Sequence, residues 1–162
     1  MSKKAKKQAT PALEVAENAG ISYTVHAYEH DPSHESFGLE AAEKLGIDPL
    51  QVFKTLVVAN GNELCVGVVP VDKHLDLKAM AHALGVKSVT MADVALAERT
   101  TGYVAGGISA LGQKKKLRTV LDASMNDFET VHVSAGRRGL EIELAPSDLA
   151  KLTDADFAPI AR

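Results

Sequence analysis

Two apolar runs in the first half of the chain are separated by a short turn signal. Residues 52–59 and 64–71 are rich in Val and Leu, and residues 60–63, which begin with Asn-Gly, lie between them. Asn-Gly between two such runs is the strongest short-range signal for a β-hairpin. Because the apolar residues are nearly continuous in both runs, we expect other elements to cover both faces of this hairpin.

The rest of the chain mixes helical and strand-like patterns without a strict βαβ order. Thr10 is placed to cap the first expected helix and Ser147 to cap the last. Seven strands and about five helices in this order predict a single α+β domain, with a mixed, mostly antiparallel sheet that curls toward a barrel and is surrounded by helices. The expected helices are residues 10–20, 39–45, 77–84, 93–99 and 147–160 (one or two helices), and the further strands are residues 21–28, 87–91, 119–121, 130–134 and 140–144.

Length and charge limit the class of protein. The 162 residues suit one domain, which we expect over residues 10–162, after a flexible basic tail at residues 1–9. A formal net charge of -3 argues against a general nucleic-acid binder, so contacts with nucleic acid must come from local basic clusters. The single cysteine excludes an internal disulfide and fits a cytoplasmic protein. No segment approaches the ~20 apolar residues that cross a membrane.

A glycine-rich segment occupies residues 101–116 and contains the adjacent pair Gly106-Gly107. Such a pair weakens a helix or a strand, so it indicates a sharp turn or a backbone that approaches a ligand closely. Adjacent amides in the turn can point at one anion or at a developing oxyanion. Three lysines follow at residues 114–116. The alternative is a plain turn joined to a solvated basic face, which the spacing alone favours.

Lys54 lies in the first strand of the expected hairpin, between Phe53 and Thr55. A lysine inside an apolar strand is costly unless its ammonium group is paired or reaches a cleft. Either Lys54 faces a cleft, or the strand lies at a sheet edge and Lys54 faces solvent, with Thr55 on the opposite side. The pattern supports both interpretations equally.

His26, His30 and His34 are spaced four residues apart, as metal ligands on one face of a helix would be. Pro32 and the strand-like pattern before His30 argue against such a helix, so we expect no metal site here. Cys65 lies inside an apolar run and is expected to be a buried core residue.

Arg137 and Arg138 lie in a short turn bounded by Gly136 and Gly139. Their guanidinium groups could grip phosphate, or the turn could be a solvated hairpin tip. Ser134 lies just before this turn. It lacks the Gly-x-Ser-x-Gly context of a nucleophile, so we do not expect it to attack a substrate.

Several ordered motifs, which extend from about residue 11 to the C-terminus, together resemble the YbaK/EbsC family of aminoacyl-tRNA editing proteins. Each motif is short, but their combination in this order makes the resemblance specific. The motifs are Tyr28-Glu29-His30-Asp31, Phe53-Lys54-Thr55-Leu56, Leu75-Asp76-Leu77-Lys78, Thr101-Gly102-Tyr103, Gly106-Gly107-Ile108-Ser109, Leu111-Gly112-Gln113-Lys114-Lys115, Ser134, and Gly139-Leu140-Glu141-Ile142-Glu143-Leu144.

The resemblance implies a barrel-like mixed sheet ringed by helices, with the aminoacyl ester bound in a cleft and no metal or organic cofactor. It implies that Lys54 is the characteristic site residue. We expect the amides of Gly106 and Gly107 to stabilise the oxyanion. The residues expected at the substrate are Tyr28, Phe37, Thr55, Ser109, Ser134 and Glu141, and those expected at the tRNA are Lys114, Lys115, Lys116, Arg137 and Arg138.

Three positions depart from the family pattern. Ala110 replaces the proline that usually follows Gly-Gly-Ile-Ser, and Arg118 interrupts the usual Leu-Pro-Thr. Both changes would loosen their loop. Glu141 stands where a shorter Asp can occur, which changes the expected contact with the amino acid.

The activity that the resemblance implies is trans-editing, the hydrolysis of mischarged aminoacyl-tRNA. The main expected substrate is Cys-tRNA(Pro), with Cys-tRNA(Cys) as a further one. The substrate thiol would attack the ester carbonyl to form a cyclic thioester, which water then opens. The alternatives are a deacylase that uses water on another small amino acid, and a non-catalytic adaptor that binds tRNA or a synthetase. The expected partners are aminoacyl-tRNA and prolyl-tRNA synthetase.

Overall fold

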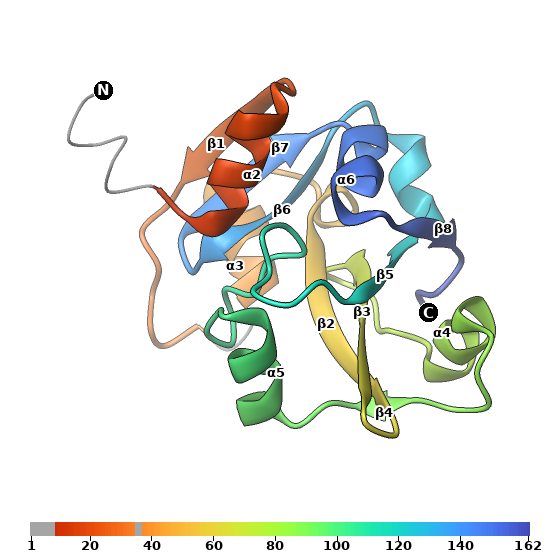
Figure 1. The fold of residues 1–162 in the computed structure, drawn as a ribbon. Coiled ribbons are helices and arrows are strands. Elements are labelled where there is room, and N and C mark those ends of the chain that lie inside the picture. The colour runs from red at the N-terminus through yellow and green to blue at the C-terminus, as the bar shows by residue number, and fades with distance from the viewer. Residues whose placement is uncertain (1–8, 35–36) are drawn as a thin grey trace.

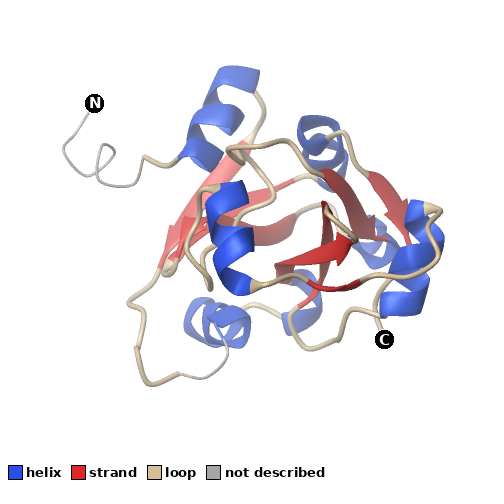
Figure 2. Cartoon of the chain, turned by 60° about the horizontal axis from the view of Figure 1, so that its bottom comes forward, coloured by secondary structure: helices blue, strands red, loops and turns tan. Residues whose placement is uncertain are grey.

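The computed structural model describes residues 9–34 and 37–162, apart from the side chain of Phe37. The flexible tail expected at residues 1–9 lies almost entirely outside this part of the chain. Within the described residues, helices surround two β-sheets (Figure 1, Figure 2), and no helix is long and apolar enough to cross a membrane. The helices are α2 (Pro11–Ala19), α3 (Phe37–Leu45), α4 (Leu77–Leu84), α5 (Val94–Thr101) and α6 (Pro146–Thr153), with short 3-10 helices η1 (Pro49–Gln51) and η2 (Ala123–Asp127). The strands are β1 (Tyr23–Ala27), β2 (Phe53–Asn60), β3 (Glu63–Pro70), β4 (Thr90–Met91), β5 (Arg118–Asp122), β6 (Val131–Arg137), β7 (Leu140–Leu144) and β8 (Asp156–Ala158).

The predicted hairpin forms the middle of the larger sheet, whose strand order is β4-β2-β3-β5-β8 (Figure 1). β2 and β3 pair antiparallel along their whole length, and Gly61 takes the left-handed conformation in the turn between them (φ 61°). β3 is buried from Leu64 to Pro70, which confirms that both faces of this strand are covered. β5 pairs parallel with β3, and β8 pairs parallel with β5.

The smaller sheet has the order β1-β7-β6 and is antiparallel throughout. Among the described residues, one backbone bridge between Val52 and His132 links it to the start of β2. The expected curling toward a barrel is therefore wrong, because the ladders of the two sheets do not continue into one another around a closed ring. The mixed, mostly antiparallel character is confirmed, since four of the six strand pairs are antiparallel.

α2 begins and ends where the sequence predicts. The Thr10 hydroxyl accepts a hydrogen bond from the amide of Leu13 at 3.2 Å, and Gly20 ends the helix in the left-handed conformation (φ 67°). The Thr10 hydroxyl also donates to the carbonyl oxygen of Ala135 in β6. The helix cap therefore also ties α2 to the smaller sheet.

The C-terminal segment differs from the prediction of helix over residues 147–160. α6 ends at Thr153, and β8 follows as a strand. Ser147 is not the cap, because the N-cap position is Ala145, which forms no side-chain hydrogen bond. The Asp122 carboxylate accepts hydrogen bonds from the amides of Ile160 at 2.9 Å and Ala161 at 3.0 Å. These contacts with a residue about 40 positions earlier hold the end of the chain extended beside β5.

Candidate active site

Seven of the residues assigned to catalysis, the substrate or the tRNA line one cavity of about 400 Å³. It lies between β2, the segment that follows α5, and the strands β6 and β7. Aliphatic side chains, including Leu56, Val94 and Ile108, form much of its wall. A small, partly apolar cavity with a few polar groups suits a small organic moiety. The assigned residues on its wall are Tyr28, Lys54, Thr55, Gly106, Ser134, Arg137 and Glu141.

Lys54 is half-buried on the cavity wall. Among the described residues, its ammonium group forms neither a hydrogen bond nor an ion pair. Burial lowers the pKa of Lys54 from its ordinary value, and the charge of Asp72 opposes the shift. This placement favours the cleft over the solvent face. The side chain is a cation held close to apolar atoms without a fixed counter-ion, so an anionic ligand would be a favourable partner.

Thr55 follows Lys54 on β2 and also lines the cavity, as do all residues from 53 to 57. The strand therefore presents its edge, and not one of its faces, to the cavity. The Thr55 hydroxyl oxygen is buried and has no hydrogen-bond partner within the described part of the chain. A buried hydroxyl without a partner costs free energy, so a ligand that supplies the missing hydrogen bond would bind favourably.

Glu141 lies in the middle of the smaller sheet, opposite His26 of β1 and Ser134 of β6. Only 6% of Glu141 is exposed, and its carboxyl group makes no hydrogen bond or ion pair to any described residue. Burial raises the pKa of Glu141 to about 8. Tyr28 lines the same cavity, where burial and the charge of Glu141 raise the pKa of its phenol to about 12. The carboxyl group is thus poised to ionise when a cation enters the cavity.

The two adjacent glycines have different roles. Gly106 is exposed on the cavity wall with φ 87°, and its amide has no hydrogen-bond partner within the described residues. The Gly107 amide, in contrast, donates to the carbonyl oxygen of Val104 at 2.9 Å. A Cβ atom on Gly107 would lie 2.7 Å from the Cα of Arg137. Gly107 therefore serves close packing, and its amide is not available to the oxyanion as the sequence analysis expected.

Side chains from three elements hold the segment around Gly106. The Ala105 amide donates to the carboxylate of Glu98 in α5 at 2.8 Å. Arg138 donates from Nε and Nη2 to the carbonyl oxygen of Ala105, at 3.2 and 2.7 Å. The Ser134 hydroxyl donates to the carbonyl oxygen of Gly107 at 3.1 Å. The sequence analysis missed Glu98 as a contributor, because no local pattern links it to a turn seven residues later.

Residues 33–152 match the model of a family described as the aminoacyl-tRNA editing domain. The chain belongs to this family. EbsC of Enterococcus faecalis, which is named as a proposed Cys-tRNA(Pro)/Cys-tRNA(Cys) deacylase, is 40% identical over 161 residues, or 99% of this chain and 98% of that protein.

Two solved structures share the fold of this editing domain. One is described as a proposed trans-editing enzyme for prolyl-tRNA synthetase; it has a TM-score of 0.79 at 22% identity and covers 100% of this chain and 99% of its own. The other, the hypothetical protein APE2540, has a TM-score of 0.84 at 24% identity over 94% of this chain and 100% of its own. At these identities the likeness concerns the fold.

Of the residues expected at the substrate of the editing domain, Ser109 does not line the cavity and the side chain of Phe37 is not described. Ser109 is fully buried, and its hydroxyl accepts a hydrogen bond from the amide of Leu111 at 3.2 Å, so it shapes the loop. Phe37 begins α3, but its side chain lies outside the described residues.

Ala110 and Arg118, which depart from the family pattern, are both held in place by the surrounding structure. Ala110 is buried in the main core. The guanidinium group of Arg118 donates to the carbonyl oxygen of Leu84, at the end of α4, at 2.6 Å. Arg118 thus pins its loop to a helix where proline would have stiffened the backbone.

The cations expected to contact tRNA fall into two groups. Lys114, Lys115 and Lys116 are exposed, and Lys116 lies 3.6 Å from the carboxylate of Asp154. Arg137 lines both the cavity and an adjoining hollow of about 440 Å³, which Arg138 also lines. The lysines thus form a solvated patch, and the arginines stand beside the cavity.

The three evenly spaced histidines do not share a centre. His26 contacts Glu143 at 2.8 Å, His30 contacts Glu40 at 2.6 Å and His34 contacts Glu43 at 3.2 Å. The expected core position of Cys65 is confirmed, because the residue is fully buried and its pKa is raised to about 11, chiefly by burial.

Proposed function

We propose that this editing domain is an aminoacyl-tRNA deacylase that acts in trans, with Cys-tRNA(Pro) as its main substrate and Cys-tRNA(Cys) as a further one. One observation carries the proposal: Lys54, Thr55 and Glu141 line a single cavity with an ammonium, a hydroxyl and a carboxyl group that have no bonded partner among the described residues. The naming of EbsC, at 40% identity, supports the choice of substrate.

The polar groups suit an aminoacyl ester. In this proposal Glu141 accepts the α-ammonium group of the amino acid, because a cation beside the buried carboxyl group restores its ionised form. Lys54 holds the terminal phosphate or the ribose of the tRNA as a cation, since an ordinary lysine is protonated at neutral pH. The Thr55 hydroxyl gains the hydrogen bond that it lacks in the protein alone.

The reaction needs little more than positioning, because an ester on a ribose hydroxyl is already activated. The sulfur of the substrate cysteine attacks its own ester carbonyl, and the Gly106 amide donates to the oxyanion that develops. The carbon–oxygen bond to the ribose then breaks, and the thiol proton passes to the departing ribose oxygen. The product is a cyclic thioester, which water opens to free cysteine.

The tRNA contacts follow from the positions of the cations. We infer that the 3′-terminal nucleotides cross the rim of the cavity at Arg137, which contacts both hollows. Lys114, Lys115 and Lys116 contact phosphates farther from the ester. Because the net charge of -3 limits this attraction, prolyl-tRNA synthetase is the proposed partner that delivers the tRNA. The proposed place of action is the cytoplasm, where this substrate is made.

The test is single-turnover deacylation of cysteinyl-, alanyl- and prolyl-tRNA(Pro) by the purified chain. The proposal expects rapid release of cysteine and slow release of the other two amino acids. Equal release of alanine would favour the route that uses water on another small amino acid. No release above the rate without protein would favour the non-catalytic adaptor.

A comparison of cysteinyl- and seryl-tRNA separates the two chemical routes. The two amino acids differ by oxygen in place of sulfur, and a hydroxyl is far less ionised and less nucleophilic than a thiol at neutral pH. Under saturating enzyme, attack by the substrate thiol predicts a much lower rate on seryl-tRNA. Comparable rates on both substrates would reject that route in favour of attack by water.

A further inference from the structure

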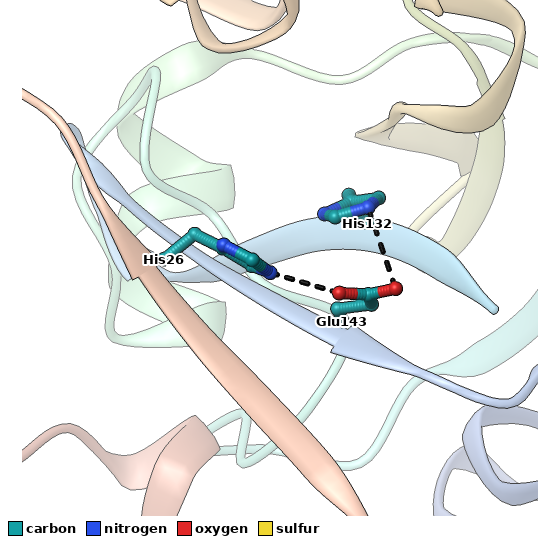
Figure 3. A group of neighbouring side chains, drawn as sticks. All are labelled: His26, His132 and Glu143. Atoms are coloured by element: carbon teal, nitrogen blue, oxygen red, sulfur yellow. Dashed lines mark hydrogen bonds and ion pairs between the residues drawn. The ribbon is translucent and has the colours of Figure 1, made fainter. Parts of the chain in front are cut away.

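A second cluster of chemically active side chains lies on the smaller sheet, outside the cavity wall. Glu143 stands on the central strand β7, directly opposite His132 of β6 and diagonally across from His26 of β1. Figure 3 shows both imidazole rings beside the Glu143 carboxylate, each facing a different one of its oxygens. His26 lies more than 100 residues before His132 and Glu143 in the sequence, and the strand register brings it to them.

The positions of the ligand atoms suit one shared ion. The His26 Nε2 lies 2.8 Å from Glu143 Oε1, and the His132 Nε2 lies 3.8 Å from Glu143 Oε2. One ligand atom from each residue lies within 4.8 Å of the others. Two ligands bound at 2.0–2.1 Å to a tetrahedral ion stand about 3.3–3.4 Å apart, so changes of up to roughly 1.4 Å in the distances between ligand atoms would complete the geometry.

His132 is the most deeply buried ring of the cluster, and its Nε2 faces the Glu143 carboxylate. Only 4% of the residue is exposed, and its Nδ1 has no hydrogen-bond partner among the described residues. Its Nε2 is too far from Glu143 for a hydrogen bond at 3.8 Å. Neither ring nitrogen is therefore satisfied by the described protein. Buried polar groups are normally bonded; a metal ion would give Nε2, which faces Glu143, a partner, and would leave Nδ1 without one.

The surroundings of Glu143 suit a metal ligand, because its carboxylate is held in one orientation and water can reach it. The Thr130 hydroxyl donates to Glu143 Oε2 at 2.6 Å, which orients the carboxylate as outer partners orient metal ligands. The side chains of His26 and Glu143 are 30% and 27% exposed, so water can complete the coordination.

We propose that His26, His132 and Glu143 bind one divalent transition-metal ion of the Zn²⁺ type. Two imidazoles and a carboxylate are a ligand set that zinc accepts, whereas Mg²⁺ prefers oxygen ligands throughout. The ion ties β1, β6 and β7 together and stabilises the sheet that carries Glu141 and Ser134. The site is separate from the deacylation chemistry, since none of its three ligands lines the cavity.

The test is calorimetric titration of the full-length, tag-free, chelator-treated chain with ZnCl₂ and, separately, with MgCl₂. The expected result is one Zn²⁺ per chain, no measurable Mg²⁺ binding, and a rise in the thermal midpoint with Zn²⁺ alone. His26→Gln and Glu143→Gln should each weaken Zn²⁺ binding by about tenfold or more. His34→Gln is the matched control, because it removes the histidine of another His–Glu pair, and it should leave the affinity unchanged.

Co²⁺ provides a second measurement that does not depend on stability. Bound at this site in place of Zn²⁺, it should give a visible absorption band that is lost in His26→Gln and kept in His34→Gln. His26 and Glu143 are partly exposed, so both variants should fold, which circular dichroism checks. Absence of stoichiometric Zn²⁺ binding, or Zn²⁺ binding that both ligand variants retain in full, would overturn the proposal.

Discussion

Arg138 donates from both Nε and Nη2 to the carbonyl oxygen of Ala105, at 3.2 and 2.7 Å. The sequence suggested that Arg138 binds phosphate. In the structure its guanidinium group hydrogen-bonds to Ala105, the residue before Gly106. The carbonyl oxygen of Ala105 receives two donors from one planar group, which fixes its direction more firmly than a single bond would. The position of the Gly106 amide is thus coupled to the turn between β6 and β7.

We therefore expect Arg138→Lys to lower the rate of the chemical step more than the affinity for tRNA. Lysine keeps the charge but cannot reproduce the two hydrogen bonds that converge on this oxygen from one planar group. A displaced loop should reduce the single-turnover rate by about 10- to 100-fold. Arg137→Lys is the control, because Arg137 lines the cavity but does not hydrogen-bond to Ala105, and this variant should retain most of the rate. Equal losses in affinity and rate for Arg138→Lys would instead favour a phosphate contact.

Gly106→Val should reduce turnover strongly. Gly106 has φ 87°, a conformation that a β-branched residue rarely adopts, so the substitution displaces the amide proposed for the oxyanion. Loss of one such donor typically costs ~3–4 kcal/mol of transition-state stabilisation. Gly61→Val, at φ 61° in the hairpin turn, is the control for strain alone and should lower the thermal midpoint with little effect on turnover. Similar activity losses in both variants would count against the oxyanion role.

Replacing Lys114, Lys115 and Lys116 by Gln should weaken tRNA binding without changing the rate at which bound substrate is deacylated. The three ammonium groups are exposed, so we expect them to act on phosphates through charge. Each phosphate contact that is lost should reduce the slope of log affinity against log salt by about 0.9 or less. The measurement is tRNA affinity at several salt concentrations, and an unchanged slope would remove these lysines from the tRNA surface.

The Cys65 thiol should resist alkylation in the folded protein. Burial is the main cause that raises its pKa to about 11, so only about one molecule in a thousand carries the thiolate at pH 8. Labelling with iodoacetamide at pH 8 should be slow for the native chain and fast in denaturant. Cys65→Ala should keep its deacylase activity, because the proposed nucleophile belongs to the substrate. Rapid native labelling, or an inactive but folded variant, would show that the protein thiol takes part.

Local sequence patterns were sufficient to predict most helices and strands. Where long-range contacts determine the secondary structure, the local patterns failed. The hairpin around Gly61 and the cap at Thr10 depend on neighbouring residues, so the sequence was sufficient to predict both. β8 is a strand because it pairs with β5 and because the amides of Ile160 and Ala161 just after it donate hydrogen bonds to Asp122, contacts that span about 35 to 40 residues. No local pattern carries that information, and a helix was predicted instead.

For the candidate site too, local patterns predicted some features and long-range contacts determined the others. Lys54 was conspicuous because a charge in an apolar strand is rare, and family resemblance indicated the polar residues of the cavity wall. The packing of Gly107 against Arg137 and the contact between Glu98 and Ala105 required the folded chain. The cluster of His26 with His132 and Glu143 likewise depends on strand register, so the even spacing of His26, His30 and His34 pointed away from it.

The most direct test is the single-turnover rate on Cys-tRNA(Pro) for Lys54→Ala beside Lys151→Ala. Lys151 is an exposed lysine on α6 that lies outside the cavity wall, so its removal controls for the loss of one charge. Lys54 has no ionic partner among the described residues, so both variants should keep the wild-type thermal midpoint. The account predicts that Lys54→Ala loses activity by about 100-fold or more while Lys151→Ala keeps it. A folded Lys54→Ala that deacylates at the wild-type rate would contradict it.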